Sequence, residues 1–94
     1  MGFRITRDDS AGDRILLHVE GELLGDEAAR LLGEEIRAAI GRGRRVIVDL
    51  HDVGWYGDAC LAILGAQPAS VALTGGGALL AAFLEQHRAA LVRP

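Results

Sequence analysis

The first part of the chain alternates apolar and polar side chains, the period-2 pattern of half-buried strands. This alternation runs over residues 3–7 and again over 14–23, where Ile15, Leu17 and Val19 fall on one face. The segment between the two runs is rich in Asp, Ser and Gly, a composition typical of a turn. We therefore expect the chain to begin with two antiparallel strands joined by a short turn.

A helical period replaces the alternation after Gly25. Asp26 stands where a helix N-cap is expected, and the first turn that follows is acidic. Gly41 and Gly43 come directly after the periodic segment and predict its end. The apolar stripe that we expect to face the core consists of Leu32, Ile36, Ala39 and Ile40.

The rest of the chain predicts two further strands and two further helices. The segment RVIVDL at 45–50 is apolar without alternation, as expected for a strand covered on both faces. A short helix is expected over 58–65, with Asp58 as its N-cap, and a last strand over 70–74. A closing helix is expected from about Ala78. Its inner stripe consists of Leu80, Phe83, Leu84 and Leu91.

These elements follow one another in the order β-β-α-β-α-β-α, which predicts a single α/β domain over residues 1–94. Strands that alternate with helices are joined by right-handed parallel crossovers, and the initial pair adds an antiparallel edge. We therefore expect a four-stranded mixed sheet with the helices packed on it.

Composition and charge exclude several classes of protein. The formal net charge is −3 and charges of both signs are interleaved, so neither nucleic acid nor an anionic membrane is an expected partner. The chain begins without an apolar leader, and no apolar run approaches the roughly 20 residues of a membrane helix. A single cysteine forms no internal disulfide, which favours a reducing compartment. We expect a cytoplasmic protein without direct membrane insertion.

The residue types that carry catalysis are sparse, and we expect no enzyme, no cofactor and no metal. None of the histidines has metal-ligand spacing to Cys60, and His18 is expected to face solvent from its strand. Cys60 and His51 could form a thiol–imidazole pair, but a small buried thiol is the expectation. The TGGG segment at 74–77 lacks the residues of a phosphate-binding loop and predicts a glycine-rich turn.

The stretch VGWYGDACLAIL at 53–64 holds the only Trp, the only Tyr and the only Cys of the chain. Trp55 and Tyr56 are neighbours, so in an extended segment they point to opposite faces. One of them can enter the core while the other faces outward and anchors a partner. Asp58 follows at the helix start, where its carboxylate can accept from the free amides two and three residues on.

Two segments and the amphipathic helix between them carry a resemblance to a known family. The segments are VEGELL at 19–24 and RVIVDLHDVGWYGDACLAIL at 45–64. They resemble the STAS domains, the sulphate-transporter and anti-sigma-factor-antagonist group, whose pattern is G-E-L-D and then D-L-S-x-V-x-F-x-D-S-x-G-L-x-x-L. The similarity extends over about residues 3–90 and implies a STAS-like (SpoIIAA-like) fold. The most telling positions are Asp49, Leu50, Val53, an aromatic at Trp55, Leu61 and Leu64.

In the antagonist members of that family, a serine at the start of the second helix is phosphorylated by a partner kinase that is itself an anti-sigma factor. The resemblance places this serine at Asp58, the Asp before it at Gly57 and the motif glycine at Cys60, while the Asp of G-E-L-D falls on Leu24. If the family motif is instead aligned so that its Asp falls on Asp58, the serine position falls on Ala59. A carboxylate has no hydroxyl to phosphorylate and carries about −1, where a phosphoserine carries about −1.5 to −2. We expect no phospho-acceptor and no serine switch.

The resemblance implies a non-catalytic protein-interaction module in bacterial regulation, of the anti-sigma-antagonist type. Its partner would be an anti-sigma factor or serine-kinase-like protein. One alternative is an accessory subunit of a lipid-exporting ABC transporter, whose partner would be the ATPase subunit. Another is a sensor of a nucleotide or other small ligand at the TGGG segment and the 53–60 loop. The expected partner-binding residues are Trp55, Tyr56, Gly57, Asp58, Ala59, Cys60, Gly25 and Asp26.

Overall fold

The structure is a computed structural model that describes residues 2–92, without the side chains of residues 79 and 86–92. Its elements follow in the predicted order of strands and helices. They are β1 (Phe3–Asp8), β2 (Arg14–Leu23), α1 (Gly25–Ile40), β3 (Arg45–Tyr56), α2 (Asp58–Gly65), β4 (Val71–Gly75) and α3 (Gly77–Val92).

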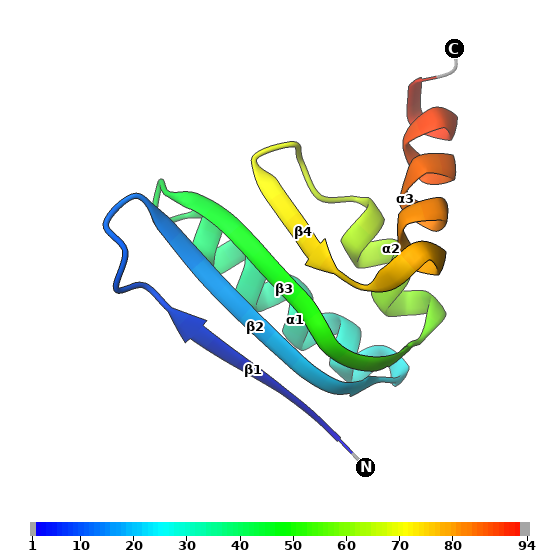
Figure 1. Ribbon diagram of the computed structural model, residues 1–94, viewed down its shortest axis with the longest axis horizontal. Coiled ribbons are helices and arrows are strands. Elements are labelled where there is room, and N and C mark those ends of the chain that lie inside the picture. Colours follow the sequence, from blue (N-terminus) through cyan, green and yellow to red (C-terminus); the bar gives the residue numbers. More distant parts are fainter. Residues whose placement is uncertain (1, 93–94) are drawn as a thin grey trace.

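The four strands form one mixed sheet in the spatial order β1-β2-β3-β4. β1 is antiparallel to β2, and the β2–β3 and β3–β4 pairs are parallel. Both crossovers step across the sheet in the same direction, so right-handed connections place α1 and α2 on one face (Figure 1). We call the opposite face, which no described helix covers, the open face. The predicted α/β architecture is confirmed.

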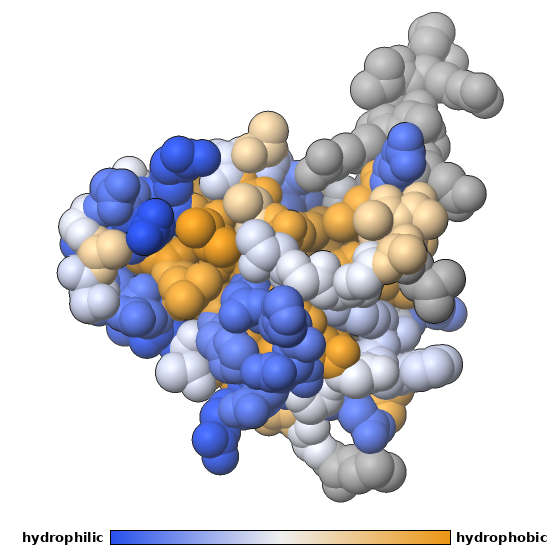
Figure 2. All heavy atoms as spheres, viewed as in Figure 1, coloured by the Kyte–Doolittle hydropathy of each residue, from blue (hydrophilic) through white to orange (hydrophobic). Residues whose placement is uncertain are grey.

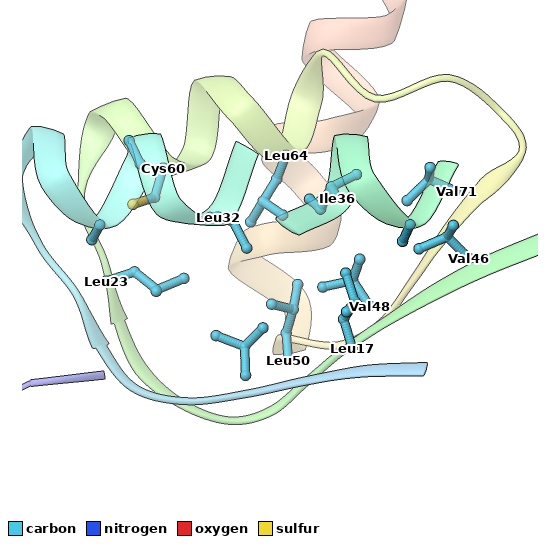
Figure 3. Packing of buried hydrophobic residues seen from close by; sticks show 14 of the residues in the cluster. Leu17, Leu23, Leu32, Ile36, Val46, Val48, Leu50, Cys60, Leu64 and Val71 are labelled. Carbon is cyan, nitrogen blue, oxygen red and sulfur yellow. The ribbon is translucent and has the colours of Figure 1, made fainter. Parts of the chain in front are cut away.

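The core lies between the sheet and its helices. Ile15, Leu17 and Val19 of β2 are fully buried, as their alternation predicts, and α1 covers them with its apolar stripe. Figure 3 shows side chains from both helices pointing toward those of the strands. The largest fully buried side chains are Ile15, Leu17, Leu23, Leu32, Ile36, Leu50, Leu64, Val19, Val46, Val48 and Cys60.

The prediction that the third strand is covered on both faces is wrong. Val46, Val48 and Leu50 are buried under the helices, but Ile47 and Asp49 alternate with them and lie half-buried on the open face. Ile47 is the register partner of Leu16 on β2, and apolar cross-strand pairs of this kind stabilise a face that has no covering layer. Figure 2 shows hydrophobic and hydrophilic residues side by side on this open face.

Both predicted aspartate caps are also wrong. The N-cap residues are Leu24 for α1 and Gly57 for α2, and neither has a side-chain cap hydrogen bond. Asp26 and Asp58 lie in the first helical turn, where an exposed carboxylate interacts with the helix dipole. The backbone N–H of Gly57 donates to the Leu23 carbonyl at 2.7 Å, which holds Gly57 in an extended conformation directly before the helix.

The remaining differences from the sequence prediction are at element ends. Ile40 is 37% exposed because it is the last residue of α1 and stands about 80° around the helix from Leu32, at the edge of the buried stripe. Leu80 of α3 is buried, Phe83 and Leu84 are half-buried, and the predicted stripe position at 91 lies outside the described side chains.

Candidate functional site

The predicted docking surface is assembled at the carboxyl ends of β2 and β3, where α1 and α2 begin. Leu23 is the register partner of Tyr56, and the bond from Gly57 to the Leu23 carbonyl links the two strand ends. A Cβ on Gly57 would stand 2.9 Å from that carbonyl oxygen and 3.7 Å from the Gly25 nitrogen. The structure therefore brings the 55–60 segment and the Gly25 loop together, and only glycine fits between them.

Trp55 and Tyr56 point in different directions, as neighbours in an extended segment do. Trp55 is 60% exposed, whereas Tyr56 is half-buried and its hydroxyl donates to the Leu50 carbonyl at 3.4 Å. Burial raises the pKa of the Tyr56 phenol, so it stays protonated. At the neighbouring strand end Leu24 is 49% exposed. Two of the three large apolar side chains that the described chain exposes therefore lie at this one corner.

The other predicted site residues divide between surface and core. Asp58 is exposed and Ala59 is half-buried in the first turn of α2. Cys60 is fully buried among the core side chains (Figure 3), and burial raises the pKa of its thiol. A neutral, buried thiol is neither a nucleophile nor a contact for a partner. Cys60 therefore belongs to the core rather than to the docking surface.

An aromatic hollow of about 410 Å³ opens beside Trp55. Three of the four aromatic residues of the chain line it, and α3 forms its far wall. The sequence pattern places Leu80 and Phe83 in the inner stripe of the last helix and contains no signal that they meet the Trp55 corner. The lining residues are Val53, Gly54, Trp55, Tyr56, Leu61, Gly76, Leu80 and Phe83.

The TGGG segment forms the predicted glycine-rich turn. Gly75 and Gly76 have φ angles of 77° and 81°, in the region that favours glycine. A Cβ on Gly75 would stand 2.6 Å from the His51 nitrogen, and one on Gly76 would stand 2.3 Å from Leu80 Cδ2. Glycine at these positions thus has a steric explanation that requires no phosphate.

His18 lies on the open face between two carboxylates, a cluster that the sequence pattern does not predict. Its Nδ1 is 3.1 Å from Asp49 Oδ2, and its Nε2 is 3.0 Å from Asp52 Oδ2. The His51 backbone N–H donates to Asp49 Oδ1 at 3.0 Å. The hydrogen bond to Asp49 raises the pKa of His18, and the bonds from His51 and His18 lower the pKa of Asp49.

A β-bulge produces this cluster. Residues three apart in a regular strand point to opposite faces, yet Asp49 and Asp52 both reach His18. The register shifts between His18, which pairs with Asp49, and Glu20, which pairs with Asp52, so β3 contains one extra residue there. Both ring nitrogens of His18 therefore face a carboxylate oxygen. Within the described part of the chain no group of three His, Cys, Asp or Glu side chains could hold a metal ion.

Comparison with known proteins identifies the fold. No family model matches the chain, and no curated protein matches it. A solved structure that does match is that of an uncharacterized protein from the DUF3478 family, with a SpoIIAA-like fold, from Shewanella loihica PV-4. The two chains are 20% identical with a TM-score of 0.53, over 83% of this chain and 70% of that one.

This chain therefore has a SpoIIAA-like fold, and the resemblance stated from the sequence is confirmed at the level of the fold. Among the described helices, none combines the length and apolar character needed to cross a membrane.

Proposed function

We propose that this chain is a non-catalytic protein-interaction module in bacterial regulation, similar to an anti-sigma factor antagonist but without the serine switch. The observation that carries the proposal is the exposure of Trp55 beside Leu24 at the start of α1 and α2. Tryptophan is enriched among the residues that dominate the energy of protein interfaces, and paired exposed apolar side chains mark such surfaces.

The chemistry of the same corner supports a surface of constant charge. Asp58 is the first residue of α2, where the family resemblance puts the phosphorylated serine, and its carboxylate has no hydroxyl for a serine kinase to phosphorylate. Cys60, the one thiol nearby, is buried and protonated. Binding is then regulated through the concentration of this module or through the state of its partner, rather than through phosphorylation of the module at this position.

The two alternative functions make different demands on this corner. An accessory subunit of an ABC-type lipid transporter would use the same surface, so the identity of the partner separates it from an antagonist. A nucleotide sensor would need cations to receive phosphates, but residues 20–28 and 51–60 contain no Arg or Lys. Charge therefore disfavours a nucleotide at this corner.

Substitution of Trp55 tests the proposal. Trp55→Ser removes the exposed anchor, and Ile40→Ser is a matched control because Ile40 is an exposed apolar residue at the far end of α1. Tagged wild type and both variants are used to capture partners from a native bacterial lysate. We expect a partner that wild type and Ile40→Ser retain and that Trp55→Ser loses, at unchanged melting temperatures.

The captured protein also distinguishes the functions. An anti-sigma factor or kinase-like protein supports the antagonist type, whereas a transporter ATPase subunit supports the accessory role. If Trp55→Ser retains every partner of the wild type, the corner is not the docking surface.

A further inference from the structure

β3 extends well past the strand that pairs with it on one side. The β3–β4 ladder ends at the pair of Leu50 with Gly75, while β3 continues to Tyr56 with β2 as its neighbour. Beyond Leu50, no backbone hydrogen bond joins residues 51–55 to another described segment on the β4 side. Figure 1 shows β3 passing below the end of β4 before the chain turns into α2. Apart from the His51 N–H, which donates to Asp49 Oδ1, an inner strand of the sheet thus ends as a free edge whose backbone groups have no described partner on the β4 side.

Two neighbouring hollows border this free edge. One is the aromatic hollow, and the other has a volume of about 330 Å³. They share Val53 and Gly76, so together they form a groove that follows residues 51–55. At about 3.3 Å per residue, this length of strand offers roughly 17 Å of backbone. The smaller hollow is lined by Leu50, His51, Val53, Gly75, Gly76 and Gly77.

The charge around the groove has one sign. Residues 21–28 and 51–60 contain no Arg or Lys, although the chain has ten such residues. Of the carboxylates there, Asp52 is paired with His18 and Glu27 with Arg30, whereas the remaining three form no ion pair within the described chain. At the opposite end of the same strands the charge is positive, because Arg14 of β2 is the register partner of Arg45 of β3. The carboxylates at the groove end are Glu22, Asp26, Glu27, Asp52 and Asp58.

We propose that the partner of this surface presents an extended basic segment that pairs with the free edge of β3 and inserts an apolar side chain into the aromatic hollow. This inference rests on the proposed function, because it names the chemistry of the partner that docks at the Trp55 corner. Main-chain hydrogen bonds would hold the segment, the hollow would select an apolar side chain, and the carboxylates would attract its cations. A second copy of this chain would bring an acidic edge against an acidic edge and is disfavoured.

Peptide probes test the strand pairing directly. The probes are acetylated and amidated hexapeptides in which Arg and Val alternate and the fourth residue is Leu, Ile or Phe. Because Trp55 is the only tryptophan, its fluorescence reports binding at this corner. We expect a saturable change with at least one probe. Two further versions of that probe carry N-methyl groups on one or the other set of alternate residues, and one of them should bind about tenfold more weakly as backbone bonds are lost.

The contributions of charge and of the aromatic hollow to probe binding are each tested with a matched control. A probe with Glu in place of Arg should give no saturable change, because it meets a surface of its own sign. Phe83→Ala, which removes a wall of the hollow, should weaken the best probe several-fold, whereas Ile40→Ala should not. The proposal is overturned if none of the three basic probes binds, if both methylated versions bind as well as their parent, or if the acidic probe binds equally.

Failure of this inference is distinguishable from failure of the proposed function. If Trp55→Ser loses the natural partner while both methylated probes bind normally, the docking surface stands and strand pairing is wrong. If Trp55→Ser keeps every natural partner, the proposed function is wrong whatever the peptides do.

Discussion

His18 is the residue whose charge state has the clearest structural effect. As an imidazolium it donates from Nδ1 to Asp49, and its Nε2 forms an ion pair with Asp52, which lies beyond the bulge. A neutral imidazole has one N–H, so one of the two carboxylates then faces a ring lone pair. Glu20 adds a third negative charge nearby, and the Arg4 guanidinium lies 3.7 Å from Glu20 on the neighbouring strand. The link between β2 and β3 on the open face is therefore strongest with His18 charged.

The pH dependence of stability follows from the two pKa shifts. The pKa of His18 is raised from 6.5, so its contribution is fully present below pH 6.5 and is lost as the pH rises through the folded value. The pKa of Asp49 is lowered from 3.8, so its contribution is present above pH 3.8 and is lost as the pH falls through the folded value. We expect His18→Gln to be less stable than wild type between these two pH values and to approach it in alkaline solution.

Urea unfolding of both proteins across this pH range measures the difference. His51→Gln is the matched control, because the structure shows a bond from its backbone to Asp49 and none from its ring to a carboxylate. A His18→Gln deficit that grows above neutral pH would contradict the assignment.

At the scale of elements, the junction of β2, β3 and α2 depends on Gly57. Its backbone φ of −76° and ψ of 158° suit any residue, so the need for glycine there is purely steric. A methyl group would stand 2.9 Å from the Leu23 carbonyl oxygen, an atom of the strand backbone that cannot move aside alone. The strand end and the helix start would have to separate to admit it.

Gly57→Ala should therefore destabilise the protein by about 1–3 kcal/mol, the usual cost of forcing extra volume into a close contact. Gly12→Ala is the matched control, since its Cβ meets nothing within 4 Å. The free energy of unfolding from urea titrations gives both values. Equal stabilities for Gly57→Ala and Gly12→Ala would show that the junction opens without cost.

Across the whole molecule, the sequence pattern predicts the architecture better than it predicts the site. The alternation of Ile15, Leu17 and Val19 identifies the buried face of β2. This is possible because successive side chains of any strand point to opposite faces, whatever the rest of the fold. The bulge that turns Asp49 and Asp52 toward His18 leaves no periodic signal, because it is a change of phase within one strand. Meetings between distant elements, such as Phe83 with the Trp55 corner, depend on the angle at which α3 packs and have no local pattern.

The core as a whole protects Cys60, and this protection is measurable. The thiol is fully buried, so its alkylation by iodoacetamide requires an opening of the structure. We expect native labelling at least about a hundredfold slower than in denaturant. The control is Ala38→Cys in a Cys60→Ala background, which places a thiol on the exposed face of α1. Equal labelling rates for the two thiols in the folded protein would contradict the assignment of Cys60 to the core.

The pairing of β3 with β2 shifts register twice between Asp49 and Trp55, so the number of residues in this segment is as important as their identity. Deletion of one residue between Asp49 and Asp52 would reverse the alternation of everything after it, up to the Gly57 junction. Asp52 would then turn toward the apolar layer, and the inward and outward roles of Trp55 and Tyr56 would exchange. Over evolution this segment should therefore tolerate a change of side chain more readily than a change of length.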